Sequence, residues 1–473
     1  MLARTLDFMR KLALPADAVL LVGVSGGPDS LALLDVLQQA KQPVIAAHFN
    51  HHLRPESGQE AAYVAQLTAE RGVRFINGEA DTPDFAKQNS LSIEEAARIL
   101  RYRFLFKSAE ALGVQAVAVA HTADDQVETV LMHLLRGAGL AGLRGMQAVN
   151  LPNEWSEAVP LVRLLLGTWR TEVLAYCREN GLQPIEDASN QQTKYYRNRI
   201  RHELVPVLES YNPQARRLLW QTADNLAQDY ELISALTGQA LKTVITQHGD
   251  GYLGCSGAGI RSLHPGLQRQ VWRRLVAVLR PGLRDVGYDL VLRAVEFASQ
   301  PDQPQAIDLT SGLRLMREGE TIWLFEAGVD LPDFEWPKLA SVEPHLLPVP
   351  GEMQLQHGWR LSASLISAGE AHLHALANQD VYQAWLDAGA FEQPLQVKAR
   401  LPGEHIAPLG MGGKTVKISD LMINEKLPQR ARANWPVVSS GGLIVWVPGY
   451  SLSHHARLKE ATRSAIHLRL QKS

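Results

Sequence analysis

The sequence predicts an α/β protein that begins with a doubly wound parallel sheet. Three observations support this fold class. Short runs rich in Val, Ile and Ala alternate with helical patterns over the first two hundred residues, a glycine-containing loop follows the first run, and the chain becomes more polar after Asp187. Alternating strands and helices of this kind form a sheet with helices on both faces, and ligands bind at the carboxyl ends of its strands. A helical middle domain and a small mixed α/β or β-rich C-terminal domain are expected to follow.

Four runs are short and apolar enough to be buried parallel strands. They are Ala18–Val24, Val44–Phe49, Val73–Ile76 and Val114–Ala120. The helical patterns between and after them are Ser30–Ala40, Glu60–Arg71, Ser92–Leu112 and Ala123–Arg136. Ser92 followed by Glu95 is a capping-box signature for the third of these helices, and Gly113 ends it.

The rest of the chain predicts two further domains. Helical patterns cover Tyr230–Thr246 and Leu267–Leu279, and a short β-like run, TIWLFEA, ends the middle region near Ala327. Gly328–Pro350 is rich in proline and acidic residues, which predicts a linker. Short strand-like runs, such as Leu443–Tyr450, lie beyond it. The predicted domains are residues 1–215, 216–330 and 345–473.

Composition narrows the class of protein. With 46% hydrophobic and 20% charged residues the chain resembles a water-soluble globular protein, and no apolar run approaches the roughly 20 residues that cross a bilayer. The formal net charge of −2 excludes a uniformly basic nucleic-acid coat and leaves room for a local basic patch. The two cysteines, Cys177 and Cys255, are too few for a disulfide framework, so a cytoplasmic location is expected.

The stretch VSGGPDS, Val24–Ser30, lies between the first strand and the first helix. Gly26 and Gly27 let main-chain N–H groups approach an anion, the serines add hydroxyl donors, and the helix that follows directs the positive end of its dipole at the loop. Asp29 repels a phosphate unless a cation intervenes, so we expect Mg²⁺ to bridge them. The loop is neither GxxxxGK[ST] nor GxGxxG. The structural alternative is a Gly-Pro turn.

Three more motifs follow other strands and helices. NHHLRPES contains His51 near the end of the second strand, and EEAARILRYRFL carries Arg101 on a helix. In AHTADDQVETVLMHLL, His121 ends a strand and Asp124, Asp125 and Glu128 occupy the first turns of the next helix. Such carboxylates either complement the helix dipole or bind Mg²⁺ or an amine.

A basic and aromatic stretch, KYYRNRIRHELVP, stands out in this nearly neutral chain. Arginines bind phosphates and tyrosines stack on bases, which is the combination used for looped RNA. Its structural alternative is a solvated helix start. The basic residues chosen as candidates are Lys194, Arg197, Arg199 and Arg201.

SGGPDS resembles the signature of the PP-loop ATP pyrophosphatases, whose Rossmann-like domain holds the pyrophosphate of ATP. Together with NHHLR, EEAARILRYRFL, AHTADDQVETVLMHLLRGAGLAGL and RNRIRHELVP, it resembles the bacterial tRNA(Ile)-lysidine synthetases over about Leu20–Leu208. The segment RLPGEHIAPLGMGGKTVK is similar to the C-terminal domain of that family.

The resemblance implies a two-step reaction. ATP adenylates C2 of the wobble cytidine in an isoleucine tRNA with a CAU anticodon, and the ε-amine of free L-lysine then displaces AMP. It also implies an enzyme without a membrane segment, and it leaves the oligomeric state open, with a homodimer as one possibility. A tRNA-thiolating PP-loop enzyme and a non-catalytic nucleotide- or RNA-binding protein remain as alternatives.

Residue roles follow from the resemblance combined with the motifs. Catalysis is assigned to Asp29, Arg101, Asp125 and Glu128, and the metal to Asp29 and Asp124. ATP is assigned to Ser25, Gly26, Gly27, Pro28, Asp29, Ser30, His51 and His121. The tRNA is assigned to Lys194, Arg197, Arg199, Arg201, Arg400, Lys414 and Lys417.

Overall fold

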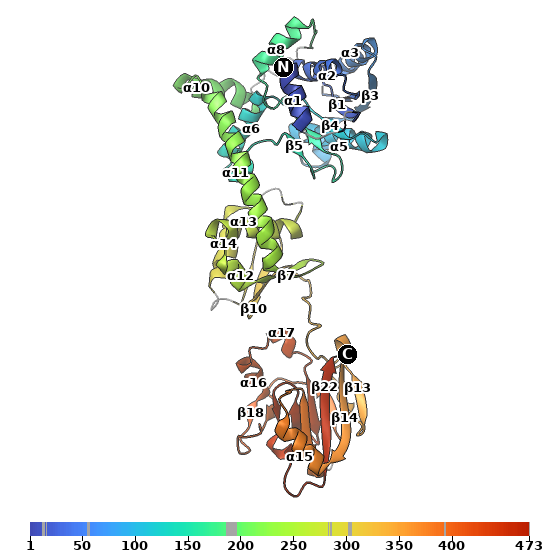
Figure 1. Ribbon diagram of the computed structural model, residues 1–473, viewed down its shortest axis with the longest axis vertical. Coiled ribbons are helices and arrows are strands. Elements are labelled where there is room, and N and C mark those ends of the chain that lie inside the picture. Colours follow the sequence, from blue (N-terminus) through green and yellow to red (C-terminus); the bar gives the residue numbers. More distant parts are fainter. Residues whose placement is uncertain are drawn as a thin grey trace. The chain divides into compact units, whose positions relative to one another are not determined.

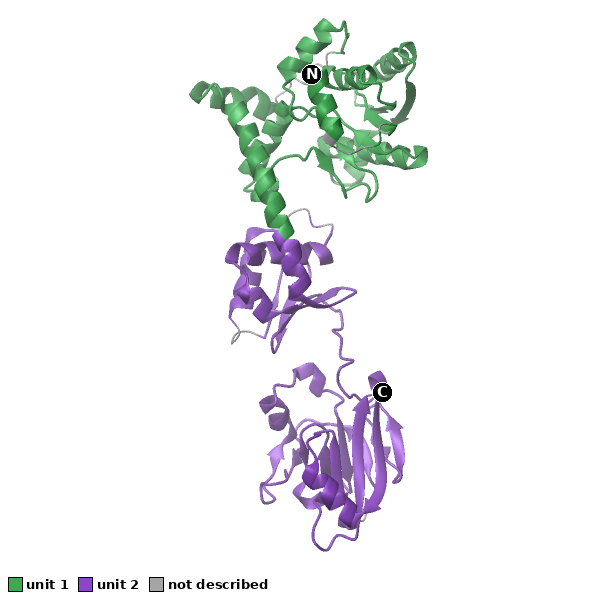
Figure 2. Ribbon diagram, viewed as in Figure 1, with its two compact units in different colours: residues 1–235 green, residues 236–473 purple. Residues whose placement is uncertain are grey.

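The protein consists of two compact units, Met1–Ala235 and Leu236–Ser473 (Figure 2). The computed structural model describes residues 1–11, 15, 17–53, 57–185, 196–281, 283, 286–300, 305–391 and 394–472. The boundary between the units falls within the long helix α11, Ala215–Val244. The predicted boundaries 1–215, 216–330 and 345–473 stay a prediction.

A parallel sheet with the strand order β3-β2-β1-β4-β6-β5 forms the centre of the first unit (Figure 1). Its strands are β1 (Leu20–Gly23), β2 (Val44–Asn50), β3 (Arg74–Glu79), β4 (Ala116–Ala118), β5 (Val149–Asn150) and β6 (Leu161–Val162). Only β5 runs antiparallel to its neighbour, β6. The four predicted strands are confirmed, whereas β5 and β6 were not predicted because each has two residues.

Helices cover both faces of this sheet, as the doubly wound pattern predicts. Leu20 and Val22 of β1 pack with α2 residues in one buried cluster, whereas Leu21 packs with Tyr102 and Leu105 of α5 in another. Alternate residues of one strand therefore reach opposite faces. The helices are α1 (Leu2–Lys11), α2 (Pro28–Gln39), α3 (Ser57–Glu70), α4 (Thr82–Gln88), α5 (Ile93–Leu112), α6 (Ala123–Leu135), α7 (Leu140–Leu143) and α8 (Arg170–Glu179).

Local sequence explains where α5 begins and ends. The Ser92 hydroxyl accepts a hydrogen bond from the Glu95 N–H, and Gly113 ends the helix in the left-handed conformation at φ 63°. Ser92 therefore caps the first turn, and a residue without a Cβ closes the last one.

A helical run after residue 195 packs against α6. It comprises α9 (Tyr196–Arg199), the π-helix η2 (Ile200–Leu204) and α10 (Val205–Tyr211), followed by α11. Ile200 and Val205 share a buried cluster with Val127 and Leu131 of α6. This apolar contact brings the basic stretch of the sequence to the acidic side of α6.

The second unit begins with a domain that is only partly helical. Helices α12 (Gly257–Ser262), α13 (Pro265–Leu279) and α14 (Tyr288–Ser299) pack on an antiparallel sheet ordered β7-β8-β11-β10-β9. The strands are β7 (Ile245–Gly249), β8 (Tyr252–Ser256), β9 (Ala306–Asp308), β10 (Leu313–Glu318) and β11 (Thr321–Glu326). Of these, only the run at β11 was predicted.

The remainder of the second unit is β-rich, as predicted. Its sheets have the orders β12-β16-β19-β20-β21 and β13-β14-β22-β15, with β17 and β18 as a separate pair. The strands are β12 (His345–Leu346), β13 (Gly351–Gln354), β14 (Trp359–Ser367), β15 (Gln383–Asp387), β16 (Gln396–Ala399), β17 (His405–Ile406), β18 (Val416–Lys417), β19 (Pro436–Ser440), β20 (Leu443–Val447), β21 (Ser451–Leu452) and β22 (Ser464–Lys472). The helices are η3 (Gln356–Gly358), α15 (Ala368–Ala377), η4 (Ala388–Ala390), α16 (Ile418–Asn424), α17 (Gln429–Arg432) and η5 (His454–Ala456).

The linker predicted over Gly328–Pro350 is partly wrong. Leu339 and Leu347 are buried in the core of the β-rich region, and β12 pairs with β16. Proline and acidic residues marked the segment as polar, but Leu339 and Leu347 anchor it.

Candidate active site

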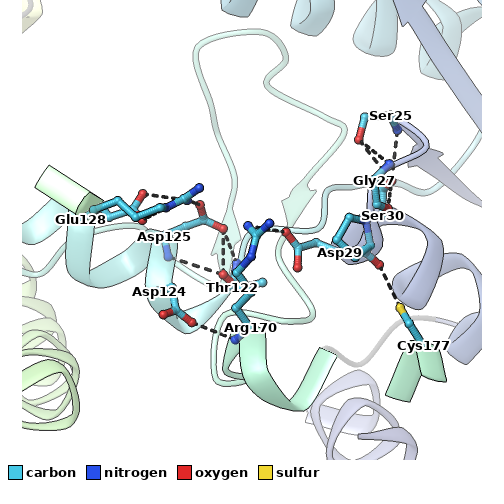
Figure 3. A network of polar contacts seen from close by, with 12 residues as sticks. Ser25, Gly27, Asp29, Ser30, Thr122, Asp124, Asp125, Glu128, Arg170 and Cys177 are labelled. Atoms are coloured by element: carbon cyan, nitrogen blue, oxygen red, sulfur yellow. Dashed lines mark hydrogen bonds and ion pairs between the residues drawn. The ribbon is translucent and has the colours of Figure 1, made fainter. Parts of the chain in front are cut away.

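The loop between β1 and α2 is organised by its own hydroxyl groups (Figure 3). The Ser25 N–H donates to Ser30 Oγ at 3.1 Å, and the two hydroxyl oxygens lie 3.2 Å apart. Ser30 Oγ also donates to the Gly27 carbonyl at 3.0 Å. Gly27 caps α2 without a side-chain hydrogen bond, so the positive end of this helix is presented to an anion at the loop.

Gly26 has a backbone conformation that favours glycine. Its φ is +86°, and a Cβ there would lie 3.2 Å from Ile185 Cδ1. Its carbonyl accepts a hydrogen bond from the Ile185 N–H at 3.0 Å. The loop is thus held tightly against the end of the segment that precedes the basic stretch.

Asp29 lies between the loop and α6. Its Oδ2 is 3.6 Å from Arg170 Nη1, whereas its buried Oδ1 has no hydrogen-bond partner in the part of the chain that the structure describes. Burial raises the pKa of Asp29 to about 6; Asp125 and Asp124 act in the same direction, and Arg170 opposes them. The positive charge of Arg170 therefore does not fully compensate the negative charge of the Asp29 carboxylate.

The carboxylates of α6 are more strongly engaged. Thr122 caps the helix, and Asp125 Oδ2 accepts hydrogen bonds from the Thr122 N–H and hydroxyl at 2.8 and 2.9 Å. Asp124 accepts from the Arg170 N–H and from Arg216 Nη1, both at 2.8 Å. Burial tends to raise the pKa of Asp125, but Arg197, His121 and the Thr122 hydrogen bonds outweigh it and hold this pKa below its ordinary value.

Glu128 is buried between two arginines of the basic stretch. Arg197 Nε donates to Glu128 Oε2 at 2.8 Å, and Arg201 Nε donates to Oε1 at 2.6 Å. Both arginines also lie 3.5 Å from Asp125 Oδ1. Arg201 belongs to the π-helix η2, a rare conformation that is frequent at functional sites. Carboxylates and arginines assigned separately from the sequence thus form one cluster.

The two predicted histidines, His51 and His121, both lie near Arg101. His51 Nδ1 lies 3.2 Å from Thr82 Oγ1, and burial, with Arg101 and His48, lowers the pKa of His51 to about 4. His121 is partly exposed, and burial of the ring, together with Arg163, Arg197 and Arg101, lowers its pKa well below the ordinary value, although Asp125 opposes this. Both rings are therefore neutral at pH 7.

Arg101 lies near these histidines without a firm anchor. Its Nε is buried and lacks a hydrogen-bond partner among the described residues, and its guanidinium lies 5.2 Å from the centre of the Tyr102 ring.

The residues predicted to bind nucleic acid are distributed over both units. Arg199 is exposed and lies 3.4 Å from Glu203, whereas Lys194 falls outside the described residues. Lys414 and Lys417 are exposed in the second unit, where Arg400 Nε donates to the Arg432 carbonyl at 3.4 Å.

Three arginines at the site were missed by sequence reasoning. Arg170, Arg216 and Arg163 contact Asp29, Asp124 and His121 respectively. None of them lies in a motif, and their partners are 42 to 141 residues away along the chain. The sequence offered a signal only for Arg163, which stands inside an apolar strand-like run, PLVRLLL, where a charged residue is unusual.

Asp29 fits the Mg²⁺ ion expected from the loop chemistry. A buried carboxylate oxygen without a partner is the kind of group that a cation satisfies. No group of three or more His, Cys, Asp and Glu side chains suited to a metal occurs within the described ranges. An ion here is therefore expected to take Asp29 and nucleotide phosphates as ligands. Asp124 is already paired with Arg216, and its role as a metal ligand stays a prediction.

The fold and the loop define a PP-loop protein that uses ATP. A family model described as PP-loop domain matches residues 3–208, and one described as TilS substrate C-terminal domain matches residues 395–469. No described helix is both long and apolar enough for a membrane span.

Curated relatives extend this match to almost the whole chain. It is 32% identical over 458 residues to a tRNA(Ile)-lysidine synthase of Dehalococcoides mccartyi, covering 94% of both chains. It is 34% identical to that of Geobacillus kaustophilus, covering 94% of this chain and 93% of the relative, and 32% identical to that of Geobacter sulfurreducens, covering 97% and 94%. The chain belongs to the tRNA(Ile)-lysidine synthase family.

Proposed function

We propose that the protein is a cytoplasmic tRNA(Ile)-lysidine synthetase, a ligase that joins free L-lysine to the wobble cytidine of an isoleucine tRNA with a CAU anticodon. The observation that carries this proposal is the direct contact between the carboxylates of α6 and the arginines after residue 195, beside the loop at Ser25–Ser30. The loop is suited to bind the phosphates of ATP, the carboxylates to bind an amine, and the arginines to bind the phosphates of RNA. This set of groups matches the three substrates of lysidine formation.

In the first step, the oxygen at C2 of the cytidine bonds to the α-phosphorus of ATP, and pyrophosphate leaves with the electron pair of the broken P–O bond. The loop and the first turn of α2 hold the departing pyrophosphate through main-chain N–H groups. When bound, Mg²⁺ offsets phosphate charge that Asp29 would otherwise repel. Arg170 keeps Asp29 in place through the ion pair at 3.6 Å.

In the second step, the lysine ε-amine bonds to C2, the C2–O bond breaks and AMP leaves with its electron pair. The attacking nitrogen must then lose a proton. Among the described residues, Asp125 Oδ1 has only the longer 3.5 Å contacts to Arg197 and Arg201, whereas both oxygens of Glu128 accept short hydrogen bonds. We therefore assign proton acceptance to Asp125, and to Glu128 the binding of cationic groups at the lysine site.

Arginines near the same carboxylates are proposed to hold the anticodon loop. Arg197, Arg199 and Arg201 offer guanidinium groups for phosphates, and Arg101 is proposed to offset charge on the activated base or the departing AMP. Lys194 completes this set, and Arg400, Lys414 and Lys417 are proposed to bind other parts of the tRNA.

Thiolation is the competing function, and the two cysteines argue against it. Cys177 is 3% exposed and donates to the Pro28 carbonyl, and Cys255 is fully buried in the other unit. Burial raises the pKa of both thiols, to about 12 for Cys255. Reactive thiols are partly exposed and have lowered pKa values.

Incorporation of labelled lysine into tRNA tests the proposal. The full chain, with ATP and Mg²⁺, is expected to label an isoleucine tRNA with a CAU anticodon. Pyrophosphate should be released when the tRNA is present, and AMP only when the tRNA and lysine are both present. The same tRNA with uridine in place of the wobble cytidine is the substrate control, and Asp29→Ala is the inactive enzyme control. Sulfur transfer without lysine incorporation would overturn the proposal.

A further inference from the structure

Arg163 is a buried cation that serves no role in the reaction as described so far. It follows β6 and is only 6% exposed. Its Nη1 donates to the Gln147 carbonyl at 2.6 Å and to Asn150 Oδ1 at 2.8 Å, and its Nε donates to His121 Nδ1 at 3.2 Å. The three acceptors come from two separate segments, so Arg163 ties His121 to β5 and to the residues just before it.

This contact fixes the tautomer of His121. A guanidinium group has only donors, so the imidazole nitrogen that it contacts must carry a lone pair. Nδ1 is therefore unprotonated, and a neutral ring must carry its proton on Nε2. Protonation of Nδ1 would place two hydrogen-bond donors face to face. Arg197 and Arg101 add positive charge around the ring and also disfavour its protonation, whereas the Asp125 carboxylate favours it.

His121 lies at the sheet edge where ATP is proposed to bind. Strands β1 and β4 are parallel neighbours with Val22 opposite Ala118, and the loop at Ser25 and the ring of His121 each follow three residues later. The carboxyl ends of such strands form the ligand site in this fold. His121 is partly exposed, and because Arg163 occupies Nδ1, the Nε2–H edge is the one left for a substrate.

We propose that Arg163 is a positioning residue that locks His121 in the neutral Nε2–H tautomer, so that His121 donates a hydrogen bond to an anionic oxygen of the adenylate phosphate. In this role His121 transfers no proton and cannot be the base that accepts the proton of lysine. The identity of the accepting oxygen rests on the proposed function, whereas the tautomer rests on the Arg163 contact alone.

Long-range ¹H–¹⁵N correlation spectra of the full chain labelled with ¹⁵N-histidine test the tautomer without any substrate. The His121 signals, assigned by their loss in His121→Gln, are expected to show one protonated Nε2 and one unprotonated Nδ1 from pH 6 to pH 8. Arg163→Met is expected to give a mixture of tautomers, and Arg163→Lys, which retains a donor, to restore most of the Nε2–H form. An Nδ1–H or doubly protonated ring in the wild-type chain would overturn the proposal.

Two substitutions of His121 test the donor role in the adenylation and transfer reactions. The amide of His121→Gln reaches the position of Nε2, whereas that of His121→Asn reaches only the position of Nδ1. We expect His121→Asn to lower kcat about 100-fold, as for loss of one preorganised donor, and His121→Gln to retain most activity. Equal losses in both variants, together with loss of the acidic limb of the pH–rate profile, would identify a general base and refute the donor role.

The same measurements distinguish a positioning role of Arg163 from a purely structural one. Arg163→Met is expected to lower kcat about 10-fold or more with little change in the KM for ATP, as for other residues that orient a ligand-binding histidine. Arg163→Lys is expected to recover kcat in parallel with the Nε2–H signal. Loss of kcat with an unchanged His121 spectrum would contradict the positioning role.

Discussion

Asp29 is a half-buried carboxylate whose one ion pair among the described residues is the 3.6 Å contact with Arg170, and its ionised form therefore lowers the stability of the fold. Its pKa of about 6 stands above the ordinary 3.8, so the folded chain binds the proton more tightly than the unfolded chain. The stability associated with Asp29 is thus present below pH 3.8 and is lost as the pH rises through about 6. Functional groups often carry such a cost.

Asp29→Asn is therefore expected to stabilise the chain at pH 7.5 in metal-free buffer, by about 1–3 kcal/mol in the free energy of unfolding. At pH 3.8 the gain should vanish. Urea titrations at the two pH values measure this difference. Mg²⁺ with ATP should raise the Tm of the wild-type chain more than that of the variant. A variant less stable than wild type at pH 7.5 would contradict the prediction.

Glu128 is a second residue whose replacement has a predictable effect on the free energy of unfolding. Glu128→Gln leaves Arg197 and Arg201, which are 34% and 22% exposed, without their short ionic contacts. We expect a loss of about 1–3 kcal/mol in the free energy of unfolding, below the value for a fully buried pair because both arginines reach solvent. Lysine transfer should fall more than ATP use.

Glu203→Gln is the matched control for Glu128→Gln. The pair of Glu203 with Arg199 is exposed by more than half on each side, so its loss should cost less than about 0.5 kcal/mol. Equal losses in the two variants, measured by denaturant titration, would argue against a buried ionic cluster.

The sequence allowed the acidic and basic residues of the site to be chosen, but not their pairing. The sequence predicts Asp125 and Glu128 from their place in the first turns of a helix and Arg197 and Arg201 from the density of basic residues in a nearly neutral chain, and the family resemblance supplies their roles. Their contacts span about 70 residues and depend on the packing of Ile200 and Val205 against α6. Periodicity and spacing carry no information on such distant pairs, so Arg163, Arg170 and Arg216 were also missed.

At the scale of elements, the turn from β1 into α2 depends on Gly26. Gly26→Ala is expected to strain the loop by about 1–2 kcal/mol, because φ is +86° and the new Cβ meets Ile185. The affinity for ATP should then fall about 10-fold, since 1.4 kcal/mol is a factor of 10. Equilibrium binding of ATP measures this change.

Gly113→Ala provides the control, since Gly113 also has a positive φ, of +63°, and no heavy atom lies within 4 Å of the Cβ position. It should lower the stability of the chain by about 1 kcal/mol and leave ATP affinity unchanged. Loss of ATP affinity in this variant would show that the effect of Gly26→Ala is not local to the loop.

Elements were predicted where local signals were strong. Helix α5 has a serine cap and a terminal glycine, and strands β1, β2 and β4 are apolar runs. The sheet of the middle region was missed because polar residues interrupt the apolar ones in β7, β9 and β10. Strand β7 pairs with β8, β10 pairs with β11, and β9 pairs with β10. This pairing stabilises the three strands, and pairing is not a local property of the sequence.

At the scale of the whole molecule, the net charge of −2 means that RNA binding must depend on local groups. Replacing both Lys414 and Lys417 by alanine is expected to weaken tRNA binding and to reduce the salt dependence of the affinity by about two in the logarithmic slope. Adenylation of saturating tRNA should be unaffected. Filter binding at several salt concentrations measures both quantities.

Lys107→Ala is the control for this pair, because Lys107 is an exposed lysine on α5 that belongs to none of the proposed RNA contacts. It should leave the affinity and the salt slope unchanged. Similar losses in both proteins would show a general effect of charge and would argue against a specific contact of the C-terminal domain.

The placement of the two cysteines supplies a built-in reporter of partial unfolding. Cys177 is buried in the first unit and Cys255 in the second, and the chain has no other thiol. Alkylating reagents should modify neither residue in the native state, and each becomes reactive only when its surroundings open. Mass spectrometry of pulse-labelled protein would therefore follow the opening of each unit separately, with no engineered label.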